Sequence, residues 1–267
     1  MPSSVKILVV GDIIGKGARN AFINYLPTLK EKYNYDIIII NAENTTHGRG
    51  LNYKHYKEYE KNNIDVMTMG NHVLDCQEIF NYIDKTNNLV VPGNINYKAE
   101  VFNNHKQCCI EFKGQTIKVI NLIGTFNNKK EFDIVDPLKY FDDIYAEDDQ
   151  SIYVIDYHAE LTLEKNLLGY YVDGRASLIY GTHTHVQTAD ERILPNKTAY
   201  ITDVGMCGSI DSVIGYDYQS FIDKIKKGSS TCVSLRTPIV LNGLLAEIDL
   251  DNKQAKCITR INGIIKK

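Results

Sequence analysis

The sequence predicts an α/β fold in which two packed, mixed β-sheets are covered by helices. Short apolar runs of strand length alternate with helical stretches early in the chain, which is typical of parallel strands joined by right-handed crossovers. Two later segments read as antiparallel hairpins, so the sheets should be mixed. The chain has 267 residues, 43% of them hydrophobic. We find no linker or internal repeat and expect one domain over residues 1–267.

The first part of the chain carries four predicted parallel strands separated by helices. The first strand, VKILVV at 5–10, is β-branched and almost continuously apolar, as buried parallel strands are. Pro27 predicts a kink or a break in the helix that follows. The further strands are expected at 36–41, 65–70 and 89–94, and the helices at 18–33, 53–63 and 75–85.

The second part of the chain begins and ends with predicted hairpins. Residues 107–124 form two strands around a Lys-Gly-Gln turn, and residues 238–263 form two strands that turn at 251–253. Between them we expect helices at 136–147 and near 160–170, and strands at 151–157, 177–181 and 199–204.

Composition narrows the functional class. The net charge is −3, so no global basic field draws the protein to nucleic acid or to an anionic membrane, and stable DNA binding is not expected. The six cysteines form no CxxC motif or disulfide-like framework, which fits a reducing compartment. No apolar run approaches membrane-span length, and the apolar run near the N-terminus is too short for a signal peptide. We therefore expect a cytoplasmic enzyme.

Five predicted strands are followed by polar residues that can bind metal. In open α/β sheets, ligands bind outside the carboxyl ends of the strands, so these residues should converge. Glycines that precede three of them, at positions 11, 70 and 181, should permit sharp exits from the sheet. The candidate residues are Asp12, Glu43, Asn44, Asn71, His72, His158, His183 and His185.

The pair His183 and His185, in the run YGTHTH, suggests what this cluster binds. In extended backbone, residues two apart point to the same side, so both rings should face the cluster. One zinc-like ion could use both, but the carboxylates favour two metals about 3.5–4 Å apart, as in phosphoryl-transfer sites. Glu43 is then a natural bridging ligand. Oxygen and imidazole ligands suit Fe, Mn or Zn, and the absence of cysteine ligands argues against a structural zinc site.

Each residue alone also has a structural interpretation. Asp12 and Asn71 are of types common at turns and helix N-caps, and His158 alone is more often a core histidine. Joint occurrence at five strand ends favours the metal interpretation. The glycine-rich segment 205–217 forms either a rim over the site or a simple connection, and His47 either approaches a substrate phosphate or only shapes a loop.

The motifs together resemble a known family. GD, NAEN, GNH, a lone His and GTHTH resemble the calcineurin-like metallophosphoesterase signature. More narrowly, VVGDIIG, NAENTTHGRGL, MGNHVLD, DYHAE, DGRASLIYGTHTHVQTADERILP and AYITDVGM resemble the bacterial YmdB-type phosphodiesterases, over nearly the whole chain. The resemblance implies a four-layer αββα sandwich (the metallophosphoesterase fold), a dinuclear centre that commonly holds iron, and activity on 2′,3′-cyclic nucleotides and some other phosphoesters.

The resemblance also implies a role for each candidate residue. The superfamily usually has D-x-H at the first strand. Here the histidine is missing, and Asn44 is the expected replacement ligand. Glu43 stands where a bridging Asp is usual. A metal-bound hydroxide attacks phosphorus, and His72 protonates the leaving alkoxide, for which an imidazole titrates in a useful range. The implied ligands are Asp12, Glu43, Asn44 and His185 for metal 1, and Glu43, Asn71, His158 and His183 for metal 2.

Three functions are compatible with this pattern. The first is a dinuclear phosphodiesterase of small phosphoesters, with two divalent or mixed-valence ions (Fe, or else Mn or Zn) and a cyclic nucleotide as substrate. The second is a phosphomonoesterase such as a nucleotidase. The third is a metal-containing regulator of RNA processing with weak hydrolytic activity. The Asn71-His72 pair favours chemistry, because a binding module needs no acid for a leaving group. A homo-oligomer is compatible with all three.

Overall fold

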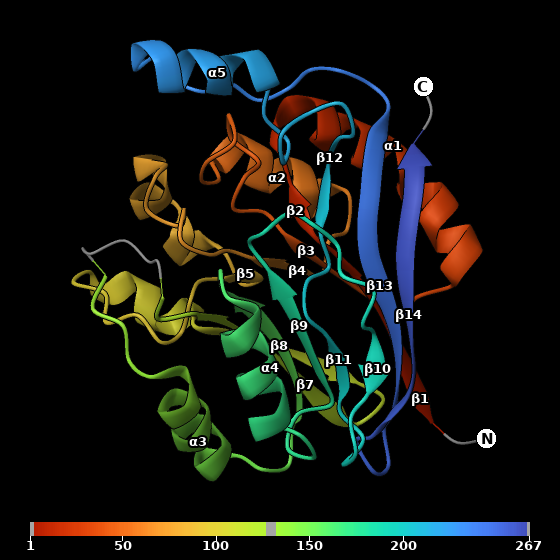
Figure 1. The fold of residues 1–267 in the computed structure, drawn as a ribbon. Helices are drawn as coiled ribbons and strands as arrows, with labels where there is room; N and C mark the ends of the chain where they lie inside the picture. The colour runs from red at the N-terminus through yellow and green to blue at the C-terminus, as the bar shows by residue number, and fades with distance from the viewer. Residues whose placement is uncertain (1–2, 127–131, 266–267) are drawn as a thin grey trace.

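The computed structural model describes residues 3–126 and 132–265 (Figure 1). Over these residues the strands form a larger sheet of eight and a smaller sheet of six. The larger sheet contains β1 (Ser4–Val10), β2 (Asp12–Ile13), β3 (Ile37–Asn41), β4 (Val66–Thr68), β5 (Leu89–Val90), β12 (Met206–Ser209), β13 (Ile239–Asp249) and β14 (Ala255–Ile265). The smaller sheet contains β6 (Gln107–Phe112), β7 (Gln115–Ile123), β8 (Ile152–His158), β9 (Leu178–Thr182), β10 (Arg192–Ile193) and β11 (Ala199–Ile201).

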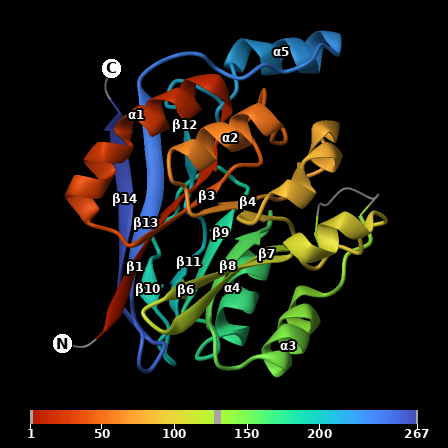
Figure 2. The ribbon, with the colours of Figure 1, turned by 180° about the vertical axis from the view of Figure 1, so that it is seen from behind.

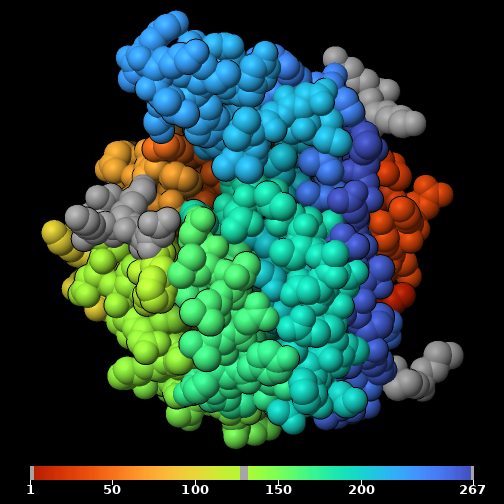
Figure 3. Space-filling model, in the orientation of Figure 1, coloured from red at the N-terminus to blue at the C-terminus, as the bar shows by residue number. Residues whose placement is uncertain are grey.

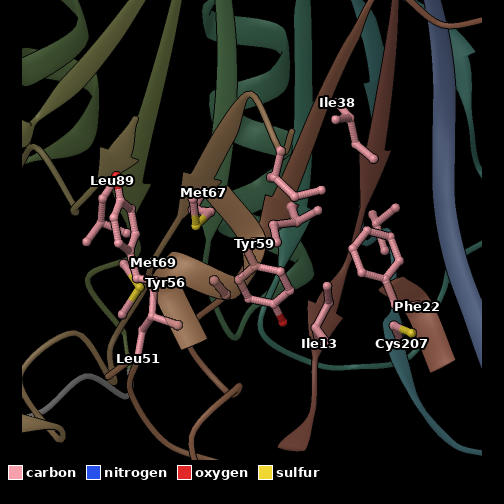
Figure 4. Close-up of a cluster of buried hydrophobic side chains, with 14 of the residues drawn as sticks. Ile13, Phe22, Ile38, Leu51, Tyr56, Tyr59, Met67, Met69, Leu89 and Cys207 are labelled. Atoms are coloured by element: carbon pink, nitrogen blue, oxygen red, sulfur yellow. The ribbon is translucent and has the colours of Figure 1, made fainter. Parts of the chain in front are cut away.

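Helices cover the outer face of each sheet, which confirms the predicted αββα layering (Figures 1 and 2). Side chains such as Phe22 and Tyr59 fill the layer between the larger sheet and its helices (Figure 4). Apolar residues of both sheets form the central layer, and Phe141 and Leu168 belong to the layer outside the smaller sheet. The α-helices are α1 (Gly15–Tyr33), α2 (Tyr53–Lys61), α3 (Pro137–Glu147), α4 (Thr162–Tyr171) and α5 (Tyr218–Lys227).

Both sheets are mixed, as predicted. In the larger sheet, β1, β3, β4 and β5 run parallel in neighbouring positions, and β13 pairs antiparallel with β1 and β14. In the smaller sheet, β7, β8, β9 and β11 are parallel. The carboxyl ends of the parallel strands of each sheet therefore meet at one edge.

The first predicted hairpin is confirmed in detail. Strands β6 and β7 pair antiparallel, and the two residues between them, Lys113 and Gly114, have φ values of 50° and 83°. Positive φ at both central positions characterises the type I′ turn, whose twist matches that of the flanking strands.

The helix predicted at 75–85 is wrong. The structure has two short 3₁₀ helices instead, Gln77–Asn81 and Ile83–Lys85. Tyr82, between them, is pulled out of helical geometry (φ −137°). Its hydroxyl donates to the carbonyl of Leu51 at 2.7 Å. A tertiary contact thus overrides the local helical preference.

Pro27 does not break the first helix, because α1 runs through it. Phe22, Leu26 and Leu29, on both sides of the proline, are buried in one layer, while Pro27 is exposed. Packing of the apolar face therefore keeps the helix whole despite the missing backbone donor.

Within the part of the chain that the structure describes, five elements were not predicted: α5, β12, the two-residue strands β2 and β10, and a third 3₁₀ helix, Glu100–His105. Helix α5 has no buried residue, and Figure 3 shows it protruding in light blue at the top of the molecule. Among the described residues, no helix is long and apolar enough to cross a bilayer.

Candidate metal centre

Four of the candidate residues meet at the carboxyl edge of the two sheets, three of them around a ring nitrogen of the fourth, His158. His158, the last residue of β8, places its Nε2 3.0 Å from Glu43 Oε1 and 2.9 Å from Asn71 Oδ1. The Nδ1 atom of His183 lies 3.0 Å from the same nitrogen. Glu43, His158 and His183 offer ligand atoms that all lie within 4.8 Å of one another. These four residues are the set that the family resemblance assigns to metal 2.

In the described residues, Asp12 and Asn44 each carry a buried oxygen that lacks a hydrogen-bond partner. Asp12 Oδ2 accepts from the backbone N–H of His183 at 3.3 Å, and Asn44 donates from Nδ2 to the Gly48 carbonyl at 2.9 Å. Within residues 3–126 and 132–265, Oδ1 of Asp12 and Oδ1 of Asn44 have no hydrogen-bond partner. Since buried polar atoms are normally satisfied, these two oxygens fit a cation. His185 points its Nε2 toward Asp12 Oδ1 at 3.8 Å.

A polar relay behind His158 fixes which nitrogen faces the cluster. Thr182 Oγ1 donates to Asp156 Oδ1 at 2.6 Å, so it accepts from Nδ1 of His158, 2.8 Å away. Nε2 of His158 is then the nitrogen that faces the cluster. Metal-binding histidines are usually held in this way through the ring nitrogen that does not bind the ion.

The other two histidines are held similarly. His183 Nε2 lies 2.9 Å from Glu160 Oε2, which leaves Nδ1 for the cluster. His185 Nδ1 donates to the carbonyl of Ile214 at 2.9 Å, which leaves Nε2 directed to Asp12. All three imidazoles therefore offer one nitrogen to the site and anchor the other.

The convergence of His183 and His185 is as predicted, but the predicted reason is wrong. Strand β9 ends at Thr182, and the two histidines have φ values of 96° and 66°. These left-handed conformations are not the extended backbone that puts alternate residues on one side. The chain turns sharply after β9, and each ring reaches its own part of the cluster.

A buried ion pair holds this strained turn. Lys165 Nζ lies 2.7 Å from Asp203 Oδ2, and both side chains are at most 2% exposed. The same carboxylate accepts from the backbone N–H and hydroxyl of Thr184 and from the N–H of Gly205. Our sequence reasoning missed this pair, although Lys165 on the apolar face of α4, three residues before buried Leu168, was a usable signal.

His72 stands beside the cluster and contacts it through its backbone. Its N–H donates to Glu43 Oε2 at 2.9 Å, and its ring Nδ1 lies 2.7 Å from Asp75 Oδ2. Asp75 thereby orients the ring, and Nε2, on the opposite side of the ring, remains for another partner. The side chain is 17% exposed, so solvent or a ligand can reach it.

The segment 205–217 begins with strand β12 (Met206–Ser209) and then forms a rim over the site. Ile214 holds His185, as described above, and the hydroxyl of Tyr216 donates to the Gly48 carbonyl at 2.9 Å. Gly48 in turn accepts from Asn44. The rim thus contacts two of the loops that carry candidate ligands, and it is more than a simple connection.

Burial and mutual attraction set the charges of the cluster. Burial raises the pKa of Asp12. Burial also opposes the charged forms of Glu43 and His158, but their mutual attraction outweighs it: the pKa of Glu43 falls and that of His158 rises to about 9. Burial, together with His158, lowers the pKa of His183 to about 3. The cluster thus buries two carboxylates against few fixed positive charges, an arrangement that a metal cation would stabilise.

Three glycines near the site are needed for space, not for turn geometry as we predicted. Gly11, Gly70 and Gly181 have no positive φ. A Cβ at Gly11 would lie 1.9 Å from the Gly205 carbonyl oxygen, and one at Gly181 would lie 1.8 Å from that of Thr202. The strands therefore approach neighbouring backbone too closely for any side chain.

Gly70→Ala should damage the centre directly, because its Cβ would lie 2.5 Å from Glu43 Oε2 and from His158 Nε2. We expect metal affinity to fall about 10–100-fold, as for loss of a group that supports a ligand, measured by competition with a chelator. Gly263→Ala is the matched control, since no atom lies within 4 Å of a Cβ there. Unchanged affinity in Gly70→Ala would show that the site tolerates a shift of these side chains.

Comparison with known proteins places the chain among phosphoesterases. A family model described as YmdB-like protein matches residues 8–261. The sequence is 42% identical to a protein of Bacillus subtilis (strain 168) named 2′,3′-cyclic-nucleotide 2′-phosphodiesterase, and the match covers 96% of each chain.

Solved structures agree. The crystal structure of a novel phosphatase from Mycoplasma pneumoniae superposes with a TM-score of 0.92 at 37% identity, covering 99% of this chain and 95% of the other. A hypothetical protein from Thermus thermophilus has a TM-score of 0.87 at 27% identity, covering 98% of this chain and 100% of the other. The NAD nucleotidase of Haemophilus influenzae, at 15% identity with a TM-score of 0.60 over 98% of this chain and 56% of that one, shares the fold.

Proposed function

The chain belongs to the YmdB-like family of metal-dependent phosphoesterases, and on that premise we propose that it is a dinuclear phosphodiesterase of small phosphoesters, with 2′,3′-cyclic nucleotides among its substrates. We also propose that residues 1–267 act as one domain. The observation that carries the proposal is the donor set: three imidazoles, each anchored through its second nitrogen, meet two carboxylates and two amide oxygens at one edge of the sheets.

The ligand sets follow from this arrangement. Metal 2 would be held by Glu43, Asn71, His158 and His183, which meet at Nε2 of His158. Metal 1 would be held by Asp12, Asn44 and His185. It would bind the two oxygens, Oδ1 of Asp12 and Oδ1 of Asn44, that lack a hydrogen-bond partner in the described residues. Glu43 directs Oε1 to His158 and is the proposed bridge. Its Oε2 accepts from the backbone of His72, which fixes the carboxylate in place. Imidazole and oxygen donors suit iron, manganese or zinc.

The protein's own groups then have separate tasks. When bound, the two ions supply Lewis acidity for activating water and for stabilising charge on the phosphoryl group. His72, oriented by Asp75, is the proposed donor of the proton that the leaving oxygen takes up. Arg49, whose side chain is 56% exposed and lies 4.0 Å from Asp75, is placed to attract an anionic substrate toward His72.

Small substrates fit this surface better than long nucleic acid. The net charge is −3, whereas a polymer binder normally neutralises several phosphates with a basic stripe. A five-membered cyclic phosphate is compact and strained, and the B. subtilis relative is named for that substrate. These points favour the cyclic diester over RNA.

Metal analysis and a substrate panel test the proposal. We expect about two ions per chain, and the highest kcat/KM on 2′,3′-cyclic AMP compared with 3′,5′-cyclic AMP, a nucleotide monoester and a single-stranded RNA. Rates should be measured at two salt concentrations, because polymer binding is strongly salt-dependent. Efficient, salt-sensitive RNA cleavage without cyclic-nucleotide activity would overturn the substrate assignment. Preference for the monoester would make the protein a nucleotidase.

A further inference from the structure

A polar cavity of about 320 Å³ lies where helices α1 and α2 begin. Both helices pack on the outer face of the larger sheet (Figure 2). None of the candidate metal ligands lines this cavity, although its walls belong to the connections that follow Asp12 and Asn44. No carboxylate is among its lining residues in the described chain. These are Lys16, Arg19, Thr45, His47, Asn52, Lys54 and His55.

Arg19 is the most buried cation of this cavity, and the hydrogen bond found for its side chain in the described residues uses Nε alone. Its side chain is 7% exposed, and Nε donates to Glu58 Oε2 at 2.8 Å. Over residues 3–126 and 132–265, no hydrogen bond is found for Nη1 or Nη2 of Arg19. A guanidinium offers five N–H donors, and Nη1 and Nη2 of Arg19 are not among the atoms of the described residues that are fully buried without a partner, so solvent or a ligand can reach them. Glu58 accepts a hydrogen bond from Nε of Arg19. An acceptor in the cavity could bind the two terminal nitrogens, Nη1 and Nη2, of the same guanidinium.

The two helix ends add positive charge at the same place. Lys16 and Lys54 are the second residues of α1 and α2, and neither helix has an acidic residue in its first turn. Cations are disfavoured there by the helix dipole. The N-terminus of α1 also has no side-chain cap. Burial, and then Arg19, lower the pKa of His55 to about 4, which agrees with a positive surrounding potential.

We propose that this cavity is a second phosphate-binding site, separate from the metal centre, in which Arg19, Lys16 and Lys54 bind a phosphate monoester. The planar guanidinium can donate to two phosphate oxygens at once, and helix N-termini bind phosphate through free N–H groups. The phosphate belongs either to a remote position of the substrate, such as the 5′-phosphate of a nucleotide, or to a separate small molecule. Binding itself does not depend on the proposed hydrolytic function.

Titration of the metal-loaded full-length protein with inorganic phosphate tests the site. The variant is the double substitution Lys16→Met/Lys54→Met, because both lysines are exposed and the fold does not need them. We expect wild type to bind phosphate at the cavity in addition to any bound at the metals. In the variant, the cavity affinity should fall about tenfold or more, while inhibition of hydrolysis by phosphate stays the same.

Two further variants sharpen the test. Lys98→Met/Lys226→Met removes the same charge from exposed positions outside the cavity and should bind phosphate as wild type does. Lys54→Arg keeps the cation and should retain binding. The proposal is overturned if the cavity double variant binds phosphate as tightly as wild type, or if the control double variant loses as much affinity.

The source of the phosphate is read from KM. If the double variant has a raised KM for the 5′-phosphorylated form of 2′,3′-cyclic AMP but not for 2′,3′-cyclic AMP itself, the site recognises the substrate's second phosphate. If both KM values are unchanged while phosphate binding is lost, the site serves a separate molecule. A protein that hydrolyses no phosphodiester but still binds phosphate here would refute the proposed function and leave this site standing.

Discussion

His72→Ala is expected to lower kcat on 2′,3′-cyclic AMP by about 10²–10⁴-fold, the usual value of a general acid, and to keep both metals. Metal retention follows from the structure, because His72 contacts Glu43 through its backbone N–H, which alanine also has. The loss should be much smaller on bis(p-nitrophenyl) phosphate, since p-nitrophenolate needs no proton to leave. Steady-state rates on both substrates, with metal content measured on the same samples, check this.

A matched variant separates positioning from proton transfer. Asp75→Asn leaves the ring of His72 in place but removes the carboxylate 2.7 Å from its Nδ1, so we expect a smaller loss and a changed dependence of kcat on pH. Equal losses for His72→Ala on both substrates would remove His72 from the role of acid. Loss of metal in that variant would make the ring a ligand.

Glu43→Gln should disrupt the metal pair far more than Asp12→Asn does. Glu43 is buried and lies against His158, and as a bridge its charge would screen two cations from each other. Gln keeps the shape but not the charge, so we expect both ions to be weakened, with metal-to-protein ratios well below those of Asp12→Asn. Activity should fall to the level of metal-depleted enzyme, because activation of water depends on the ions. Elemental analysis after dialysis measures the ratios.

Glu160→Gln is the control for this loss of charge. Glu160 lies 2.9 Å from His183 Nε2, on the side of the ring away from the cluster, and its side chain is 42% exposed. It should retain two ions with modestly lower affinity. Two tightly bound ions in Glu43→Gln would exclude Glu43 as the bridge.

The fold was predictable where local pattern and tertiary packing agree. The buried strands such as 5–10 have an unbroken apolar sequence, and the hairpin at Lys113 and Gly114 has turn chemistry that needs no distant partner. Strand β12 was missed because it owes its pairing to β2 and β13, not to its glycine-rich sequence. The helix predicted around Tyr82 was wrong for the same reason, since a contact with the distant carbonyl of Leu51 sets the local geometry.

The candidate ligands of the site were predictable from the sequence, but the residues that hold those ligands in place were not. Strand ends that carry Asp12 or His158 must meet at one edge once the sheets are parallel, so their types and order were enough. The groups that orient them come from remote positions. Thr182 and Asp156 hold His158, and Lys165 of α4 reaches Asp203, which lies between β11 and β12. No local spacing indicates such contacts. The one signal was Lys165, a charged residue on the apolar face of α4.

The placement of β1 between β3 and β13 has a consequence for biosynthesis. The two strands that pair with β1 are synthesised at different times. β3 follows β1 closely in the sequence, whereas β13 comes about 230 residues later, at Ile239–Asp249. While the ribosome makes the intervening chain, β1 keeps one edge of unpaired amides, the kind of edge that invites aggregation. Gly11, next to Asp12, also donates to Asn242 of β13. The position of Asp12 is therefore fixed only after β13 has been made, so metal loading should follow the synthesis of that strand.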